Sequence, residues 1–182
     1  AWDISLGSES IKIAIIDNGA PANHLDLNVF KQRDVSDNDD DATPPQTYNQ
    51  SSSWSHGTHC AGTVAGNGDA SAKNKLGIAP NSWLIGLSMG ELAFTIDEYS
   101  ALEHVYQLSK PGSATQQAWN IKVVTNSWGP GFPFDSIDAN DLTVQIIEKI
   151  TIENPIGHPS RREEALPLLK EKFIKNSGTI KK

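Results

Sequence analysis

Short apolar runs rich in β-branched residues alternate along the chain with longer segments whose apolar residues recur at helical spacing. Three runs have the length and composition of buried strands, at residues 11–16, 83–87 and 121–125. The spacing predicts three helices, at residues 59–65, 96–108 and 142–150. Strands that alternate with helices are typical of a parallel sheet. We therefore expect an α/β fold in which helices flank a parallel sheet.

Two of the predicted strands end in polar residues. Asp17 follows the run 11–16 and leads into a turn, and the run 121–125 is closed by residues 126–129 (NSWG). Ligands of parallel sheets gather at the carboxyl ends of the strands. We therefore expect the functional site at this edge of the sheet, with Asp17 in it.

Composition and charge narrow the possible functions. The chain has 182 residues, 37% of them hydrophobic, which suits one α/β domain, and a net charge of −7. This charge argues against a nucleic-acid partner held through its phosphates. No run approaches the roughly 18 apolar residues of a membrane span, and no charged-then-apolar leader opens the sequence, so we expect any signal peptide to be absent or removed.

The charge changes sign near residue 155. Residues 1–154 carry 8 basic and 19 acidic side chains, whereas residues 155–182 carry 7 basic and 3 acidic ones. We interpret 1–154 as one domain and 155–182 as a divergent tail. The tail is predicted to be an amphipathic helix, because a capping box at 160–163 precedes an apolar stripe formed by Leu166, Leu169 and Phe173.

The segment 54–66 (WSHGTHCAGTVAG) carries the candidate chemistry. A zinc site at His56 and His59 is disfavoured, because the metallopeptidase pattern spaces its histidines at i and i+4 with a glutamate between them. A histidine that acts as a general base needs a carboxylate to fix its tautomer, and Asp17 is a plausible partner. Spacing alone favours the alternative, in which residues 17–19 form only a turn and His56 is an N-terminal residue of the helix.

Four blocks in order resemble the subtilisin-like serine peptidases over roughly residues 1–130: residues 13–27 (IAIIDNGAPANHLDL), 56–66 (HGTHCAGTVAG), 76–80 (LGIAP) and 123–129 (VVTNSWG). The resemblance implies a three-layer α/β sandwich and a secreted peptidase acting on peptide or protein substrates. By this likeness Asp17 orients the imidazole and His56 is the base. Three residues would pair with the substrate backbone as an added strand: Ser127, Trp128 and Gly129.

An acidic loop at residues 34–41 (DVSDNDDD) and the segment 126–130 (NSWGP) resemble the kexin and furin branch of that family. The resemblance implies calcium ligands at Asp34, Asp39 and Asp41, and Asp26 is a second candidate. Carboxylate oxygens suit Ca²⁺, although acidic runs are commonly only solvated loops. His59 stands where kexin-like enzymes have arginine, so a preference for dibasic sites is not carried over.

Two blocks of the family pattern are absent from these 182 residues: the Gly-Thr-Ser-Met-Ala turn with the nucleophile, and the Ala-Ala-Gly-Asn block with the oxyanion-hole side chain. We therefore expect a fold that is incomplete on its C-terminal side and a chain that is inactive alone. The missing half or an oligomer partner would then cover the exposed sheet edge. The alternatives are a non-catalytic calcium- or peptide-binding module and a plain α/β domain. Cys60 is expected to pack rather than react.

Overall fold

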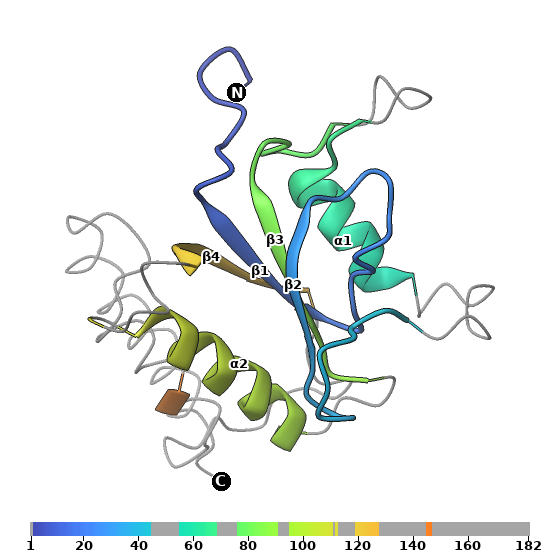
Figure 1. Ribbon diagram of the computed structural model, residues 1–182, viewed down its shortest axis with the longest axis vertical. Coiled ribbons are helices and arrows are strands. Elements are labelled where there is room, and N and C mark those ends of the chain that lie inside the picture. Colours follow the sequence, from blue (N-terminus) through green and yellow to red (C-terminus); the bar gives the residue numbers. More distant parts are fainter. Residues whose placement is uncertain are drawn as a thin grey trace, which may run out of the picture.

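A four-stranded parallel sheet lies at the centre of the protein (Figure 1). The computed structural model describes residues 2–44, 55–68, 76–90, 95–110, 112, 119–127 and 145–146. The strands are β1 (Lys12–Asp17), β2 (Val29–Asp34), β3 (Trp83–Ser88) and β4 (Ile121–Asn126), in the order β2-β3-β1-β4. All three pairings are parallel, so the carboxyl ends of the strands share one edge.

The alternation of side chains along β1 separates two cores. Ala14 and Ile16 pack in one apolar cluster with residues of α2 (Thr95–Ser109). Ile13 and Ile15 pack in a second cluster with residues of α1 (His56–Ala65). Because successive side chains of a strand point to opposite faces, α1 and α2 cover opposite faces of the sheet (Figure 1). The expected three-layer α/β arrangement is confirmed.

Helix α1 packs through small residues. Gly57, Ala61 and Ala65 are buried and lie along one face of the helix. This spacing lets the helix approach the sheet closely. The helix begins at His56, three residues before the predicted start. Its first turn lies at the edge of the sheet where β1 ends.

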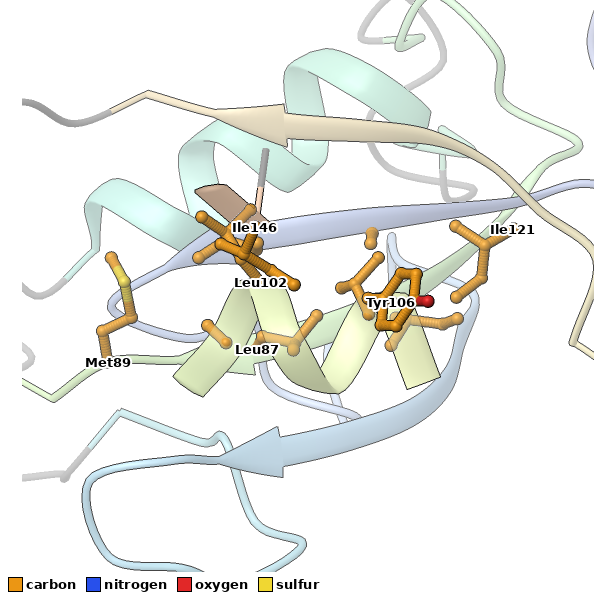
Figure 2. Close-up of a cluster of buried hydrophobic side chains, with 11 residues drawn as sticks. Leu87, Met89, Leu102, Tyr106, Ile121 and Ile146 are labelled. Carbon is orange, nitrogen blue, oxygen red and sulfur yellow. The ribbon is translucent and has the colours of Figure 1, made fainter. Parts of the chain in front are cut away.

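Helix α2 packs through larger side chains. Figure 2 shows Leu102 and Tyr106 of α2 against Leu87 and Ile121 of the sheet, all of them buried. Asp97 and Glu98 lie in the first turn, where acidic side chains favour the helix dipole. This core covers the face of the sheet opposite α1. The spacing of apolar residues in the sequence predicted both ends of α2 to within one residue.

The strand β2 was not predicted from the sequence, and Asp34 closes it instead of opening a loop. Its middle residues are Lys31, Gln32 and Arg33, which carry no apolar alternation. Strand β2 lies at one edge of the sheet, and its strand conformation comes from backbone pairing with β3. A polar edge strand of this kind leaves little hydrophobic signal.

Several predictions fall on residues that the structure does not describe. Of the helix expected at 142–150, only residues 145–146 are described, as helical, and Ile146 is buried in the α2 core. The tail 155–182, with Leu166, Leu169 and Phe173, lies outside the described residues, so the domain boundary stays a prediction. No helix in the described part of the chain is long and apolar enough to cross a membrane.

Candidate active site

The last residues of β1, β3 and β4 lie close together at one edge of the sheet. Asp17 lies opposite Ser88 in the pairing of β1 with β3, and Ile16 lies opposite Asn126 in the pairing of β1 with β4. Helix α1 begins at the same edge with His56. The fold therefore gathers one carboxylate and one imidazole from segments that are 39 residues apart in the sequence.

The side chains of Asp17 and His56 contact each other directly. Asp17 Oδ1 lies 2.8 Å from His56 Nδ1. The carboxylate accepts, so the Nδ1 position carries the proton and Nε2 keeps its lone pair. Asp17 is 4% exposed and the side chain of His56 is 46% exposed. A buried carboxylate thus holds a ring whose other nitrogen is free to exchange protons, which is the arrangement of a general base.

Asn18 ties the start of α1 to the end of β1. Its Oδ1 accepts a hydrogen bond of 2.8 Å from the backbone N–H of Gly57. The residue that precedes the helix, Ser55, forms no side-chain capping hydrogen bond. The first-turn N–H of Gly57, which has no acceptor within α1, is therefore satisfied by the residue that follows β1. This role of Asn18 was not predicted, and its only signal in the sequence was an amide side chain directly after Asp17.

Position 57 requires glycine, because the first turn of α1 lies against the backbone at the end of β1. A Cβ on Gly57 would overlap the carbonyl oxygen of Gly19 and would lie 3.0 Å from Asp17 Cβ. Any larger residue would push the first turn of α1 away from β1. Gly57 therefore sets how closely His56 approaches Asp17.

Cys60 lies one helical turn after His56. Its Sγ is 3.9 Å from both ring nitrogens of His56. An atom at equal distance from both nitrogens lies off the lone-pair axis of each, so this is not the geometry of a thiol nucleophile and its base. Burial raises the pKa of the Cys60 thiol, and the carboxylate of Asp17 raises it further, while a side-chain hydrogen bond with Ser127 lowers it.

The contact with Ser127 brings the end of β4 into the site. Ser127 follows β4 directly, is exposed, and lies close enough to Cys60 to lower the pKa of its thiol. Trp128 and Gly129 lie outside the described residues. One of the three predicted substrate-binding residues thus lies beside the relay formed by Asp17 and His56, and the other two remain predictions.

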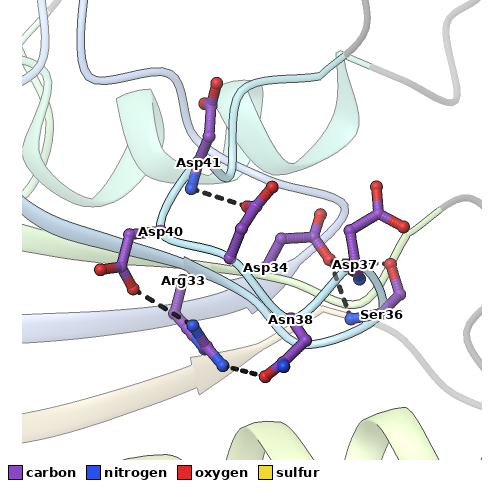
Figure 3. A network of polar contacts seen from close by, with 8 residues as sticks. Arg33, Asp34, Ser36, Asp37, Asn38, Asp40 and Asp41 are labelled. Carbon is purple, nitrogen blue, oxygen red and sulfur yellow. Dashed lines mark hydrogen bonds and ion pairs between the residues drawn. The ribbon is translucent and has the colours of Figure 1, made fainter.

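The acidic loop follows β2 and is held by its own hydrogen bonds (Figure 3). Asp34 Oδ1 accepts from the backbone N–H of Ser36 at 2.8 Å and of Asp37 at 3.0 Å. Burial alone would raise the pKa of Asp34, but hydrogen bonds from Asp37, Ser88 and Ser36 together hold it below its usual value. The ionised form of Asp34 therefore organises the turn.

The other carboxylates of the loop face separate partners. Asp39 Oδ1 accepts from the backbone N–H of Asp41 at 2.9 Å, and Asp41 Oδ1 accepts from Thr43 at 3.0 Å. Asp40 pairs with Arg33 at 3.3 Å. Figure 3 shows the side chains of Asp34, Asp40 and Asp41 spread around the loop.

A calcium ion would need several of these oxygens around one point. In the part of the chain that the structure describes, one set of three metal-ligating side chains lies close together, and it is Asp17, His56 and Cys60. Asp34, Asp39 and Asp41 do not form such a set. Asp26 does not belong to such a set either, and its backbone carbonyl accepts a hydrogen bond from the backbone N–H of Asn67 at 2.9 Å. Calcium therefore stays a prediction, and no step of the chemistry is assigned to it.

Most of the chain matches a single family of known proteins. The model of the Subtilase family (Peptidase_S8) matches residues 8–163. Neuroendocrine convertase 2 of Bos taurus is 32% identical over 155 residues, which cover 80% of this chain and 22% of the relative. The minor extracellular protease Vpr of Bacillus subtilis is 40% identical over 90 residues, which cover 47% of this chain and 10% of the relative. The chain thus spans less than a quarter of the length of these two curated relatives.

Solved structures with the same fold agree with this match. Sphericase superposes with a TM-score of 0.59 at 22% identity, over 81% of this chain and 44% of that one. The Aeromonas sobria serine protease ASP, solved in complex with the chaperone ORF2, gives a TM-score of 0.56 at 23% identity, over 80% of this chain and 22% of that one. At sequence identities below 25%, this structural similarity shows that the fold is shared and shows nothing more.

Proposed function

Because the chain belongs to the subtilase family, we propose that Asp17 and His56 are the acid–base half of a serine peptidase active site. The hydrogen bond of 2.8 Å between His56 Nδ1 and Asp17 Oδ1 carries this proposal. The nucleophilic serine and the oxyanion-hole donor would come from residues outside these 182.

In the proposed reaction, Nε2 of His56 takes the proton of the serine hydroxyl as its oxygen attacks the carbonyl carbon of the peptide. The same nitrogen then donates this proton to the leaving amine. Asp17 keeps its negative charge throughout, holds the ring in the correct tautomer, and stabilises the imidazolium that forms. The exposure of His56 leaves room for a nucleophile to approach from another segment.

The proposed substrate is a peptide or protein in extended conformation. It would add as a strand along Ser127, Trp128 and Gly129, with its backbone hydrogen-bonded to them. The position of Ser127 supports this, because it follows β4 and lies beside the face of α1 that carries His56. Strand β4 is an edge of the sheet formed by the described strands. The name of the extracellular Bacillus subtilis relative supports a secreted location for this chain as well.

The chain by itself is expected to show no turnover. In this family, loss of the nucleophile lowers kcat by on the order of 10⁶-fold. A missing oxyanion donor costs a further factor of about 10²–10³ where the effects combine. The second candidate function is a peptide-binding module without catalysis, which the exposed Ser127 at the end of β4 favours.

An active-site serine probe separates the two functions. A fluorophosphonate should label a longer parent polypeptide that carries a Gly-Thr-Ser-Met-Ala block. Labelling should be lost in His56→Ala and retained in the exposed control His59→Ala. A parent polypeptide that binds peptides but resists the probe would support the binding module and exclude the peptidase.

A further inference from the structure

We propose that Asp17, His56 and Cys60 form a binding site for Zn²⁺ or a similar borderline-soft divalent cation. One ligand atom from each of these residues lies within 4.8 Å of the others. Binding itself does not depend on the proposed peptidase function. Only its consequence, the loss of His56 as a base, rests on that function.

The helix places two of the ligands on one face. His56 and Cys60 are four residues apart in α1, and side chains at this spacing lie above one another. The sulfur lies 3.9 Å from each ring nitrogen. Zinc bonds of about 2.3 Å to sulfur and 2.0 Å to nitrogen, at a tetrahedral angle, set the two ligand atoms about 3.5 Å apart. Side-chain rotation, rather than movement of α1, can therefore aim both ligands at one ion.

The buried carboxylate supplies the second, independent observation. Asp17 is 4% exposed, and its Oδ2 is buried with no hydrogen-bond partner among the described residues. A buried carboxylate oxygen without a partner is costly, because it has lost its hydration. A divalent cation bound next to His56 and Cys60 would satisfy this oxygen and neutralise the buried charge.

The donor set selects the type of metal. A thiolate, an imidazole and a carboxylate suit Zn²⁺ and related ions, whereas Ca²⁺ takes oxygen ligands alone. Three protein ligands leave a fourth position for water. The half-exposed side chain of His56 gives the ion a path from solvent. This site is therefore chemically distinct from the acidic loop at residues 34–41.

Metal binding and the base function exclude each other. Because Asp17 faces Nδ1, the cation would bind Nδ1 in place of its proton. The neutral ring then carries its proton on Nε2 and has no lone pair with which to act as a base. The thiol of Cys60 loses its proton to solvent when the sulfur becomes a ligand. Within the peptidase proposed above, the cation would act as a reversible inhibitor that competes with the relay between Asp17 and His56.

Calorimetric titration of the reduced, chelator-stripped chain with Zn²⁺ tests the site without any assay of turnover. We expect one equivalent to bind, and Co²⁺ in its place to give a thiolate-to-cobalt charge-transfer band. Cys60→Ser should remove this band and weaken binding by at least about tenfold. His59→Ala, on the same helix, and Asp39→Asn, in the acidic loop, should leave the affinity and the band unchanged.

A second measurement on the unaltered chain covers the case in which Cys60→Ser fails to fold. Zn²⁺ should slow the alkylation of Cys60 by iodoacetamide, and a chelator should restore the rate. The proposal is wrong if Zn²⁺ shows no saturable binding at millimolar concentration, if the folded Cys60→Ser variant binds it unchanged, or if alkylation is unaffected. Because neither readout involves peptide hydrolysis, an inactive parent peptidase would leave this result standing.

Discussion

The side chain of Asn18 accepts a hydrogen bond from the backbone N–H of Gly57, and this contact fixes the first turn of α1 against the last residue of β1. The two residues flank the relay, since Asn18 follows Asp17 and Gly57 follows His56. The distance between the carboxylate and the imidazole therefore depends on how this helix terminus is anchored.

Removing the anchor should loosen the helix terminus. Asn18→Ala deletes the acceptor and leaves the Gly57 N–H without it, so the free energy of unfolding should fall by about 1 kcal/mol, the usual cost of a lost helix cap. Urea denaturation measures this change. Asn18→Asp keeps an acceptor oxygen and serves as the matched control, and equal stability of Asn18→Ala and the unaltered chain would show that the contact is not stabilising.

Two glycines of α1 provide a matched pair of alanine substitutions. Gly57→Ala should be destabilising, because the new Cβ meets the backbone of Gly19 and the side chain of Asn18. Gly62→Ala should stabilise α1 by up to about 1 kcal/mol, since its Cβ meets nothing within 4 Å and alanine favours the helix. Thermal melting of both variants checks the opposite signs, and a neutral Gly57→Ala would contradict the close docking of α1.

The stability of the α2 face should depend on pH through His104. Burial of its imidazole, followed by the charge of Arg33, lowers the pKa of His104 below its ordinary value of 6.5, and Asp40 opposes this shift. The unfolded chain therefore takes up the proton first as the pH falls. Stability should be lost between pH 6.5 and the lower folded-state pKa.

His104→Gln should flatten this part of the stability profile, as measured by urea denaturation at neutral pH and at about pH 5.5. The exposed residue His59 offers the control His59→Gln, which should leave the slope nearly unchanged. An identical slope in His104→Gln would assign the acid sensitivity to other groups.

Calcium binding by the acidic loop predicts a concentration-dependent rise in melting temperature. A ligand that binds only the folded state stabilises it by RT ln(1 + [L]/Kd). Asp39→Asn and Asp41→Asn should reduce the rise, whereas Asp26→Asn should not if the loop alone holds the ion. An unchanged melting temperature at millimolar calcium would remove the calcium prediction.

The sequence pattern predicted the buried strands and missed the exposed one. Strands β1, β3 and β4 begin or end within one residue of their predicted bounds, because each is an apolar run closed by polar residues. Strand β2 is polar in its middle and gains its conformation from pairing with β3, a contact that a single sequence does not reveal. The start of α1 was predicted late, since small residues give a weak periodic signal.

The candidate site followed from resemblance more than from local pattern. Spacing alone left open whether Asp17 and His56 interact, because 39 residues separate them. The contacts of Asn18 with Gly57 and of Cys60 with His56 depend on how α1 docks at the end of β1, so neither contact was predicted. The metal-binding partner considered, and disfavoured, for His56 was His59, whereas the structure places Cys60 in the cluster with His56.

Proton NMR of the His56 ring tests the central claim most directly. A proton shared between His56 Nδ1 and Asp17 Oδ1 should give a resonance far downfield of the amide region. Asp17→Ala should remove this resonance and Asp40→Ala, in the acidic loop, should not. A folded chain in which His56 shows no such resonance, or keeps it in Asp17→Ala, would contradict the assignment of these two residues as an acid–base pair.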